Sequence, residues 1–321
     1  MEISVVLATY NRAASLRAAL DSFSKLVIPA NLDWELIVVD NNSTDKTRTV
    51  VEEFQRCSGV QGAYLFEGQQ GRSFALNAGI KRARGGVIAF TDDDISLHPQ
   101  WLANLHDVFV ETRCSAAAGR VIPVWNHPKP DWLEMDDQLA IVRFEMGDEV
   151  KEIRIPPLGA NCAFRREIFK SYGMFRLDLG VSGSRHTITC DDTEFGERLI
   201  RGGEKIVYCP SAIVYHPVDP ERATKKYFLT WYYYNGRSLT RTLGLPLEGT
   251  FYFGVPRWLF RGFATNVARW LFTFDKNRRF HRKLWTYRSL GNIVESHRLS
   301  RMRNAVRARF VTTPSAEGQR P

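Results

Sequence analysis

Residues 85–95 read GGVIAFTDDDI, an apolar run that ends in three consecutive carboxylates, Asp92, Asp93 and Asp94. We call these three residues the acidic triplet. Adjacent like charges repel, and a buried carboxylate without a partner costs several kcal/mol, so a positive group is expected beside them. Carboxylates at a strand end suit Mg²⁺ or Mn²⁺, which take oxygen ligands and often bridge to a substrate diphosphate. The alternative is a solvated acidic turn, and the triplet alone leaves both interpretations open.

Around this stretch, the first half of the chain alternates apolar runs with amphipathic helical segments. The runs ISVVLA, WELIVVD, GAYLFE and GVIAF are expected to form strands. This alternation predicts an α/β fold with a mostly parallel sheet and helices on both faces. Ligands bind such sheets beyond the carboxyl ends of the strands, where Tyr10, Asp40 and the acidic triplet fall. Three distant segments should therefore meet in one crevice.

The pattern weakens over residues 121–155, where PVWNHPKPDWLEMDD predicts an irregular insertion over the site. Regular structure is expected again from LGANCAFRREIF, and GVSGSRHTIT is flexible by composition. After the helix DDTEFGERLIRGG, the segment KIVYCPSAIVYH is expected to supply a last pair of strands. Beyond Pro217 the sequence becomes aromatic and basic. We therefore predict an α/β domain over residues 1–218 and a helical, basic extension over residues 219–321.

Charge separates these two parts. Residues 1–220 carry 24 Lys and Arg against 30 Asp and Glu, whereas residues 221–321 carry 20 against 5, which gives balances of −6 and +15. The basic part invites an anionic partner, either a nucleic acid or a membrane surface. No RNA-recognition motif is visible in it, which argues against nucleic acid.

One helical segment of the extension has an apolar side and a basic end. Seven of its residues fall within one arc of roughly 120° on a helical wheel, and the run KNRRFHRK follows. The seven are Leu259, Phe260, Phe263, Val267, Trp270, Leu271 and Phe274. Such a helix is typical of an anionic membrane interface. The alternative is a helix packed on the domain with a solvated basic end. The last residues, TTPSAEGQRP, are expected to be disordered.

Other features favour a cytoplasmic location. The five cysteines are scattered, which is typical of reduced thiols. The N-terminal apolar stretch is too short for a signal peptide, and no run of about 18 apolar residues could span a bilayer. We expect a cytoplasmic protein, with peripheral attachment to the inner face of the cell membrane if the basic helix binds lipid.

Four motifs in order resemble glycosyltransferase family 2, whose members have the GT-A fold. They are VVLATYNR, IVVDNNSTD, GRSFALNAGIKRARG and FTDDD, and the resemblance covers roughly residues 1–218. The resemblance implies that the first motif receives the nucleotide of a sugar donor. The residues concerned are Ala8, Thr9, Tyr10 and Arg12.

The second and third motifs supply two more candidate nucleotide ligands. By the resemblance, Asp40 would accept a hydrogen bond from a uracil ring, and Arg72 would lie near the base or the diphosphate. Asp40 could instead cap the helix that follows, but NNSTD offers other caps and so leaves Asp40 for a ligand. Arg72 could be an ordinary surface arginine, although it precedes a helix beside the carboxylates.

The resemblance also implies a metal site. FTDDD matches the family's Asp-x-Asp motif, so that Asp92 and Asp93 approach the ribose and the metal and Asp94 is the main metal ligand. In this family a histidine after the last core strand completes the metal shell, and His216 in IVYHPV matches it. A lone histidine at a strand end is otherwise structural, but neutral imidazole is a plausible ligand for Mn²⁺ beside carboxylates. The expected cofactor is Mn²⁺ or Mg²⁺.

The motif CDDTEF stands where the family has its catalytic carboxylate. Asp191 and Glu194 have capping-box spacing, which leaves Asp192 over. By the resemblance Asp192 is the general base, since an inverting transfer needs a carboxylate to take a proton from the acceptor hydroxyl. The family usually has Glu where Asp191 stands and often Gly at Cys190, which leaves the choice between the two aspartates open; we favour Asp192.

LGANCAF resembles the segment that lines the pocket for the acceptor and the donor sugar. Gly159 and Ala160 would allow close approach, Asn161 could bond a sugar hydroxyl, and Asp191 would lie beside them. A Gly-Ala turn before a strand is common, which makes this motif less specific.

The sequence therefore predicts a metal-dependent, inverting glycosyltransferase with a UDP-sugar donor. Its acceptor would be a saccharide or a lipid-linked glycan. The first alternative is a sugar-1-phosphate nucleotidyltransferase, which would carry a GxGTR loop where this chain has ATYNR. The second is a membrane- or nucleic-acid-binding protein on a degenerate transferase domain, against which the intact carboxylates at 92–94 and 192 argue.

Overall fold

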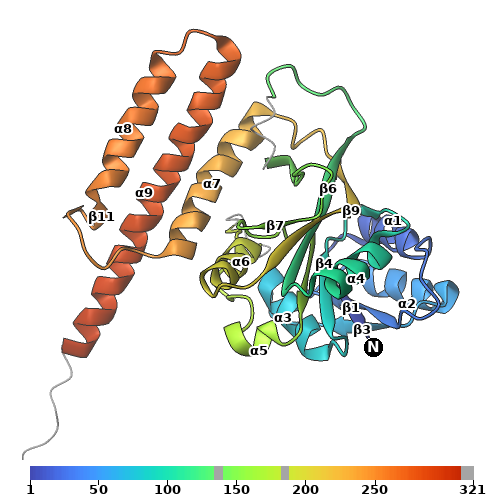
Figure 1. The fold of residues 1–321 in the computed structure, drawn as a ribbon. Coiled ribbons are helices and arrows are strands. Elements are labelled where there is room, and N and C mark those ends of the chain that lie inside the picture. Colours follow the sequence, from blue (N-terminus) through green and yellow to red (C-terminus); the bar gives the residue numbers. More distant parts are fainter. Residues whose placement is uncertain (134–139, 182–187, 312–321) are drawn as a thin grey trace, which may run out of the picture. The chain divides into compact units, whose positions relative to one another are not determined.

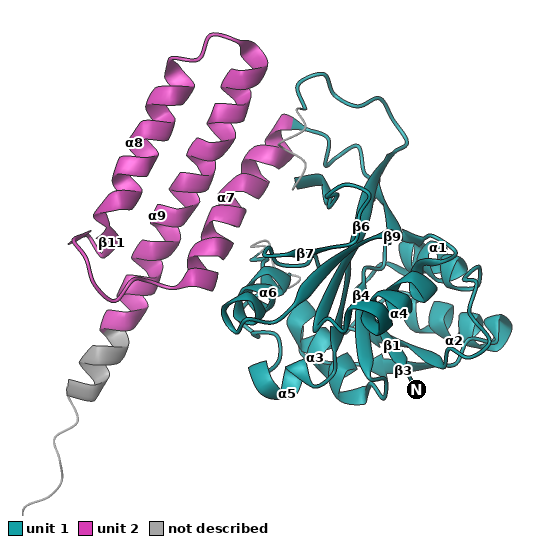
Figure 2. Cartoon of the chain, viewed as in Figure 1, with its two compact units in different colours: residues 1–224 teal, residues 225–321 magenta. Residues whose placement is uncertain are grey.

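The structure is a computed structural model that describes residues 1–133, 140–181 and 188–311 (Figure 1). It divides into two compact units, Met1–Thr224 and Lys225–Pro321 (Figure 2). The first unit ends at residue 224 rather than at the predicted 218, because the segment after the last strand packs with it. The second unit is helical, as its sequence predicts.

Within the described residues of the first unit, nine strands form one sheet, in the order β3-β2-β1-β4-β8-β6-β9-β5, with β7 beside β9. The strands are β1 (Ile3–Thr9), β2 (Trp34–Asp40), β3 (Gly62–Phe66), β4 (Val87–Thr91), β5 (Ser96–Leu97), β6 (Ala116–Trp125), β7 (Lys151–Ile153), β8 (Asn161–Arg165) and β9 (Ile206–Val218). Strands β1 to β4 pair in parallel, as do β6 and β9, whereas β8 runs antiparallel between β4 and β6. The short strands β5 and β7 also pair antiparallel with β9. The sheet is therefore mostly parallel, with antiparallel strands at its centre and beside β9.

Helices cover both faces of this sheet, as predicted. They are α1 (Ala13–Phe23), α2 (Thr47–Ser58), α3 (Arg72–Arg82), α4 (Trp101–Thr112), α5 (Ile168–Tyr172) and α6 (Asp191–Arg201). Alternate residues of β1 enter two separate apolar cores, with Val5 and Leu7 in one and Val6 in the other. Helices α1, α2 and α4 contribute to the first core, and α3, α5 and α6 contribute to the second. The parallel strands β1, β2 and β4 end their buried runs at the same edge, where polar residues begin.

Two sequence predictions are wrong in detail. The segment KIVYCPSAIVYH forms one long strand, β9, rather than a pair. Its register against β6 shifts between Gly119 and Arg120, which pair with Cys209 and Ile213. The segment predicted to be irregular, PVWNHPKPDWLEMDD, begins with the last three residues of β6, and β7 forms later in the stretch 121–155 where the pattern weakens. Residues 134–139 and 182–187, which belong to the expected insertion and to GVSGSRHTIT, lie outside the described residues, as does TTPSAEGQRP.

The second unit consists of α7 (Lys225–Leu243), β10 (Phe251–Tyr252), β11 (Val255–Pro256), α8 (Arg257–Leu271) and α9 (Lys276–Val311). Helix α9 packs against both α7 and α8. Gly236 and Gly291 allow α7 and α9 to approach closely, since a Cβ at either would lie 2.0 Å from a backbone oxygen of the other helix. Glu295 is fully buried and pairs with Arg237 and Arg241 at 2.8 and 2.5 Å. No helix among the described residues is both long and apolar enough to cross a membrane.

Candidate functional site

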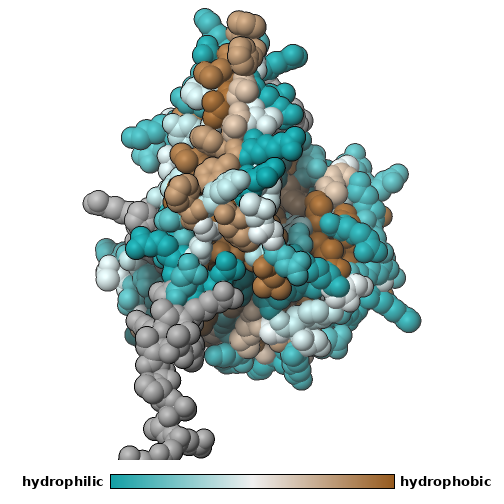
Figure 3. Space-filling model, turned by 90° about the vertical axis from the view of Figure 1, so that its left-hand side faces the viewer, coloured by the Kyte–Doolittle hydropathy of each residue, from teal (hydrophilic) through white to brown (hydrophobic). Residues whose placement is uncertain are grey.

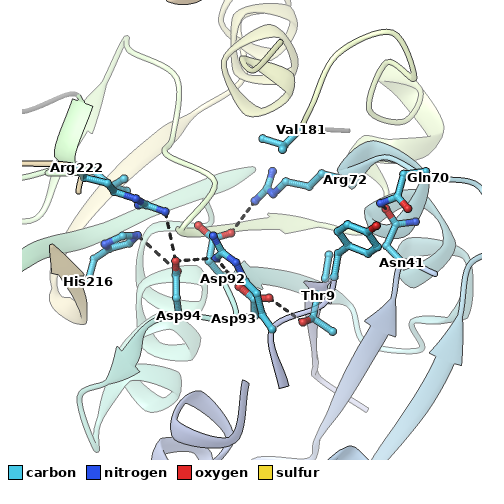
Figure 4. Close-up of a pocket in the computed structure, with 14 residues that line it drawn as sticks. Thr9, Asn41, Gln70, Arg72, Asp92, Asp93, Asp94, Val181, His216 and Arg222 are labelled. Atoms are coloured by element: carbon cyan, nitrogen blue, oxygen red, sulfur yellow. Dashed lines mark hydrogen bonds and ion pairs between the residues drawn. The ribbon is translucent and has the colours of Figure 1, made fainter. Parts of the chain in front are cut away.

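A cavity of about 360 Å³ opens at the carboxyl ends of β1 and β4 (Figure 4). Nine of the predicted site residues line it: Ala8, Thr9, Tyr10, Arg12, Arg72, Asp92, Asp93, Asp94 and His216. They come from β1 and its following loop, the start of α3, the end of β4, and β9. The structure therefore brings together segments that lie up to two hundred residues apart in the sequence.

Three arginines pair with the acidic triplet. Their ion pairs are Arg12 with Asp93 and Asp94 at 3.1 and 2.8 Å, Arg72 with Asp92 at 3.0 Å, and Arg222 with Asp94 at 3.7 Å. The sequence predicts a divalent cation as the positive charge beside the triplet. In the structure, three arginine side chains from other segments of the chain supply positive charge at this place.

Asp93 is the most enclosed carboxylate of the triplet. It is 6% exposed and accepts a hydrogen bond from Thr9 Oγ1 at 2.7 Å. Burial, opposed by Arg12 and by the Thr9 hydroxyl, raises the pKa of Asp93 from 3.8 to about 6. The folded protein therefore favours the protonated form of this residue more than the unfolded chain does.

We expect Asp93→Asn to change how stability depends on pH. Between pH 4 and 6 the folded state retains a proton that the unfolded chain has lost, so the free energy of unfolding falls as pH rises through this window. The loss is up to roughly 3 kcal/mol for a shift of about two units, and Asp93→Asn should abolish it. Urea unfolding with EDTA at several pH values measures the effect, and Asp107→Asn, at a side chain that is 61% exposed, is the control. Parallel pH profiles for wild type and Asp93→Asn would contradict the expectation.

Asp94 and His216 have the arrangement of a pair of metal ligands. His216 Nδ1 lies 2.9 Å from the carbonyl oxygen of Pro217, to which it donates a hydrogen bond. This bond leaves the lone pair of neutral His216 on Nε2, which lies 3.5 Å from Asp94 Oδ1. Metal-binding histidines commonly donate their second ring N–H to a backbone carbonyl in this way.

The donor set fits Mg²⁺ or Mn²⁺ if part of the coordination shell comes from a ligand. Across the described residues, no group of three or more His, Cys, Asp or Glu side chains could hold an ion by itself. Mg²⁺ is often bound through one or two carboxylates and completes its shell with substrate phosphates and water. Asp94 and His216 would therefore hold an ion that arrives with a diphosphate.

Asp191 and Asp192 stand at the start of α6 in different environments. Asp191 is buried and pairs with Arg72 at 2.6 Å. Asp192 is half-buried and accepts hydrogen bonds from the backbone N–H of Gly159 at 2.7 Å and of Thr193 at 2.6 Å. Burial and the neighbouring Asp191, opposed by Arg72, raise the pKa of Asp192. A raised pKa on a half-buried carboxylate suits a proton acceptor, whereas Asp191 is neutralised by its arginine.

The predicted capping box at this helix is wrong. The residue before the helix is Cys190, at φ 70°, and its side chain makes no capping hydrogen bond. Asp191 is already helical, and Glu194 pairs with Arg198 at 2.9 Å rather than reaching back to the helix start. A positive φ also explains why glycine suits the position of Cys190.

We expect Gly159→Ala to lower activity roughly 10- to 100-fold, because it displaces groups at the site. A Cβ at Gly159 would lie 2.9 Å from both Arg72 Nη2 and Asp192 Oδ2, which is closer than a real Cβ contact. Gly68→Ala is the matched control, since its Cβ would make an ordinary contact at 3.7 Å with Phe66. The rates of both variants, at equal unfolding temperature, test the prediction. Equal rates would show that the arginine and the carboxylate can move aside.

Three predicted ligand residues have internal roles. Asp40 does cap its turn: it is 2% exposed and accepts hydrogen bonds from Ser43 N at 2.9 Å and Tyr64 Oη at 2.8 Å. Asn161 is fully buried, and the prediction that it bonds a sugar is wrong, because its amide is used within the protein. Its partners are Trp101 Nε1 and the carbonyl oxygens of Arg120 and Ala212. Ala160 is also buried, with its carbonyl bonded to Thr91.

Five residues that line the cavity were not predicted from the sequence: Asn41, Gln70, Val142, Val181 and Arg222. Asn41 had a signal, because it directly follows the strand-end Asp40. Its Oδ1 accepts a hydrogen bond from Gly71 N at 2.7 Å and thereby ties the turn after β2 to the start of α3. Arg222 had no local signal, since its approach to Asp94 depends on the path of the chain after β9.

Comparisons with known proteins agree with this architecture. A family model described as Glycosyl transferase family 2 matches residues 4–173, more than half of the chain. The glucosyl-dolichyl phosphate glucuronosyltransferase of Haloferax volcanii is 27% identical over 227 residues, which cover 67% of this chain and 69% of that protein.

Two solved structures share the fold. The mannosyltransferase PcManGT from Pyrobaculum calidifontis, in complex with GDP-Man and Mn²⁺, aligns with a TM-score of 0.56 and 18% identity over 99% of this chain and 76% of that one. S. aureus TarS 1-349, in complex with UDP-GlcNAc, aligns with a TM-score of 0.55 and 16% identity over 95% and 92%. At these identities the likeness shows the fold alone, and it confirms the predicted GT-A arrangement.

Proposed function

Because the chain belongs to glycosyltransferase family 2, we propose that it transfers a sugar from a nucleotide-sugar donor to an acceptor hydroxyl with inversion and with a divalent metal. One observation carries the proposal. Arg72 lines the cavity and pairs with both Asp92 at the end of β4 and Asp191 at the start of α6. Asp192, the carboxylate suited to a base, directly follows Asp191, and a Cβ at Gly159 would lie 2.9 Å from both Arg72 Nη2 and Asp192 Oδ2. Arg72 therefore links the acidic triplet to the helix start that carries the candidate base.

The chain's own residues would divide the work between binding and proton transfer. Asp192 takes the proton of the acceptor hydroxyl as that oxygen attacks the anomeric carbon, and its two backbone hydrogen bonds hold its orientation. Asp191 keeps Arg72 in place. Arg12 and Arg222, which contact Asp94, are the donors available to phosphate oxygens. A Mn²⁺ or Mg²⁺ held by Asp94 and His216 would supply Lewis-acid stabilisation of the leaving diphosphate.

We propose a UDP-sugar as donor and a saccharide or lipid-linked glycan as acceptor. TarS forms a complex with UDP-GlcNAc, and the name of the Haloferax relative includes a dolichyl phosphate. PcManGT forms a complex with GDP-Man, so GDP-sugars are the competing donors. The test incubates the full chain with UDP- and GDP-sugars and Mn²⁺ and measures released nucleotide. Release from no donor at any metal concentration would overturn the proposal.

Family membership leaves the alternative functions without support. A sugar-1-phosphate nucleotidyltransferase would require a different first loop, and the family model spans the loop that this chain has. A degenerate, non-catalytic domain would not need to keep the acidic triplet in the cavity and Asp192 beside Gly159, next to an arginine that lines it.

We further propose that the protein attaches peripherally to an anionic membrane through its second unit. The charge balance of +15 over residues 221–321 supports this, since each basic residue near an anionic surface contributes roughly 1 kcal/mol. Co-sedimentation with anionic vesicles should weaken with salt without disappearing, because apolar contacts are not screened.

A further inference from the structure

Three exposed apolar side chains lie at the turn between α8 and α9. Leu271, Phe272 and Phe274 are 52%, 77% and 91% exposed. Figure 3 shows apolar side chains at the upper end of the helical unit, where this turn lies in Figure 1. We call these residues the apolar tip. Neighbouring exposed apolar side chains with a polar surround mark a site of interaction.

Basic residues dominate the surroundings of the apolar tip. Residues 249–294 contain nine Lys and Arg and one acidic residue, Asp275. Asp275 Oδ1 accepts a hydrogen bond from Arg278 N at 2.8 Å and so caps the start of α9. The exposed basic residues nearest the tip in the sequence are Arg269, Lys276, Arg278, Arg279 and Arg282. An apolar tip in a basic surround is complementary to a bilayer with anionic headgroups.

The middle of α8 offers a poor surface for lying flat on a membrane, although Trp258 near the start of the helix is 65% exposed. Leu259 is 6% exposed, and Phe263 and Val267 are half-buried, so part of the predicted apolar arc packs within the helical unit. Of the two interpretations that the sequence leaves open, packing within the helical unit therefore holds for these three residues. The exposed positions between residues 261 and 269 are small or basic: Arg261, Gly262, Ala264, Thr265, Ala268 and Arg269.

We propose that the apolar tip inserts end-on into an anionic lipid surface while the rest of α8 stays out of it. The inference rests on the proposed peripheral attachment and specifies its contact. Helix α8 has 15 residues, a length of about 22 Å. This length separates the tip from the β10–β11 turn at the other end of α8, where Phe253 is 87% exposed. A flat helix would use both ends, whereas end-on insertion uses one.

The test compares two changes at exposed phenylalanines in the full chain. Phe272→Ser with Phe274→Ser removes the aromatic part of the tip, and Phe253→Ser is the matched control at the opposite end. Partitioning onto vesicles of phosphatidylcholine mixed with phosphatidylserine, and of phosphatidylcholine alone, is measured with circular dichroism as the check on folding. The tip variant should partition roughly 100-fold more weakly onto anionic vesicles, and Phe253→Ser should match the wild type.

Each other outcome overturns the proposal in a different way. An equal loss for Phe253→Ser would mean that the helix lies flat. Unchanged partitioning of the tip variant would mean that basic charge alone suffices. A wild type that ignores both vesicle types but binds a single-stranded RNA probe would make nucleic acid the partner. Nucleotide release from a donor sugar, measured without vesicles, tests the transferase proposal separately.

Discussion

Asp192→Asn should lower the rate of sugar transfer at least about 10²-fold while leaving nucleotide affinity nearly unchanged. The amide cannot take the acceptor proton, and Asp192 does not line the cavity that would receive the diphosphate. Because the base works only when ionised and its pKa is raised, the wild-type rate should also increase with pH through the ionisation of this carboxyl. Steady-state transfer rates and calorimetric UDP binding measure the two effects.

Asp191→Asn is the matched control for this prediction. It removes the partner that Arg72 contacts at 2.6 Å, so its effect should appear in donor binding more than in the chemical step. The asparagine at 192 can accept only one of the two backbone hydrogen bonds, so unfolding temperatures must be compared first. Near-normal transfer by Asp192→Asn together with a lost rate in Asp191→Asn would reverse the assignment of the two residues.

Asp94→Ala should abolish the stimulation of UDP binding by Mn²⁺. In the proposed site Asp94 and His216 would hold the ion, and the remaining coordination sites would fall to the diphosphate and water. Loss of this carboxylate should therefore remove the coupling between Mn²⁺ binding and UDP binding. The affinity for UDP in the presence of Mn²⁺ should fall by roughly 100-fold or more. Calorimetry with UDP in Mn²⁺ and in EDTA measures the coupling.

The control for Asp94→Ala is Asp107→Ala, which removes an exposed carboxylate of α4 outside the cavity. It should keep the full difference between Mn²⁺ and EDTA. If the wild type binds UDP equally well in Mn²⁺ and in EDTA, the assignment of Asp94 and His216 as metal ligands is wrong. In that case Arg12 and Arg222 would be sufficient counter-charges for the site.

The strand ends were predictable because each combines a buried apolar run with a polar residue at its close. β1, β2 and β4 have this form, and their ends meet at one edge since they pair in parallel. The motifs at the ends of these strands were therefore sufficient to predict where the cavity lies. The antiparallel β8 was not predictable in this way, because an apolar run carries no record of its direction or of its neighbours.

The fate of individual polar side chains was harder to predict. The sequence predicts that Asn161 bonds a sugar hydroxyl, but its amide forms hydrogen bonds with residues of α4, β6 and β9. The spacing of residues along the chain does not reveal these hydrogen bonds. The contact of Arg222 with Asp94 was not predictable for the same reason. The apolar arc of α8 was visible on a helical wheel, but the sequence could not show that α9 covers part of it.

The register shift in β9 decides which side of the sheet His216 occupies. Val207 and Cys209 enter the same core as Ala212 and Val214, so odd positions face that core before the shift and even positions after it. His216 is an even position after the shift, so it lies on the same face of the strand as Ala212 and Val214. A related chain could lengthen or shorten residues 210–212 and keep both halves of the strand paired with β6, whereas one residue inserted after Ile213 would turn the histidine to the opposite face. Any gap in an alignment of this strand therefore belongs at residues 210–212, and a histidine displaced by such a gap can still be the equivalent ligand.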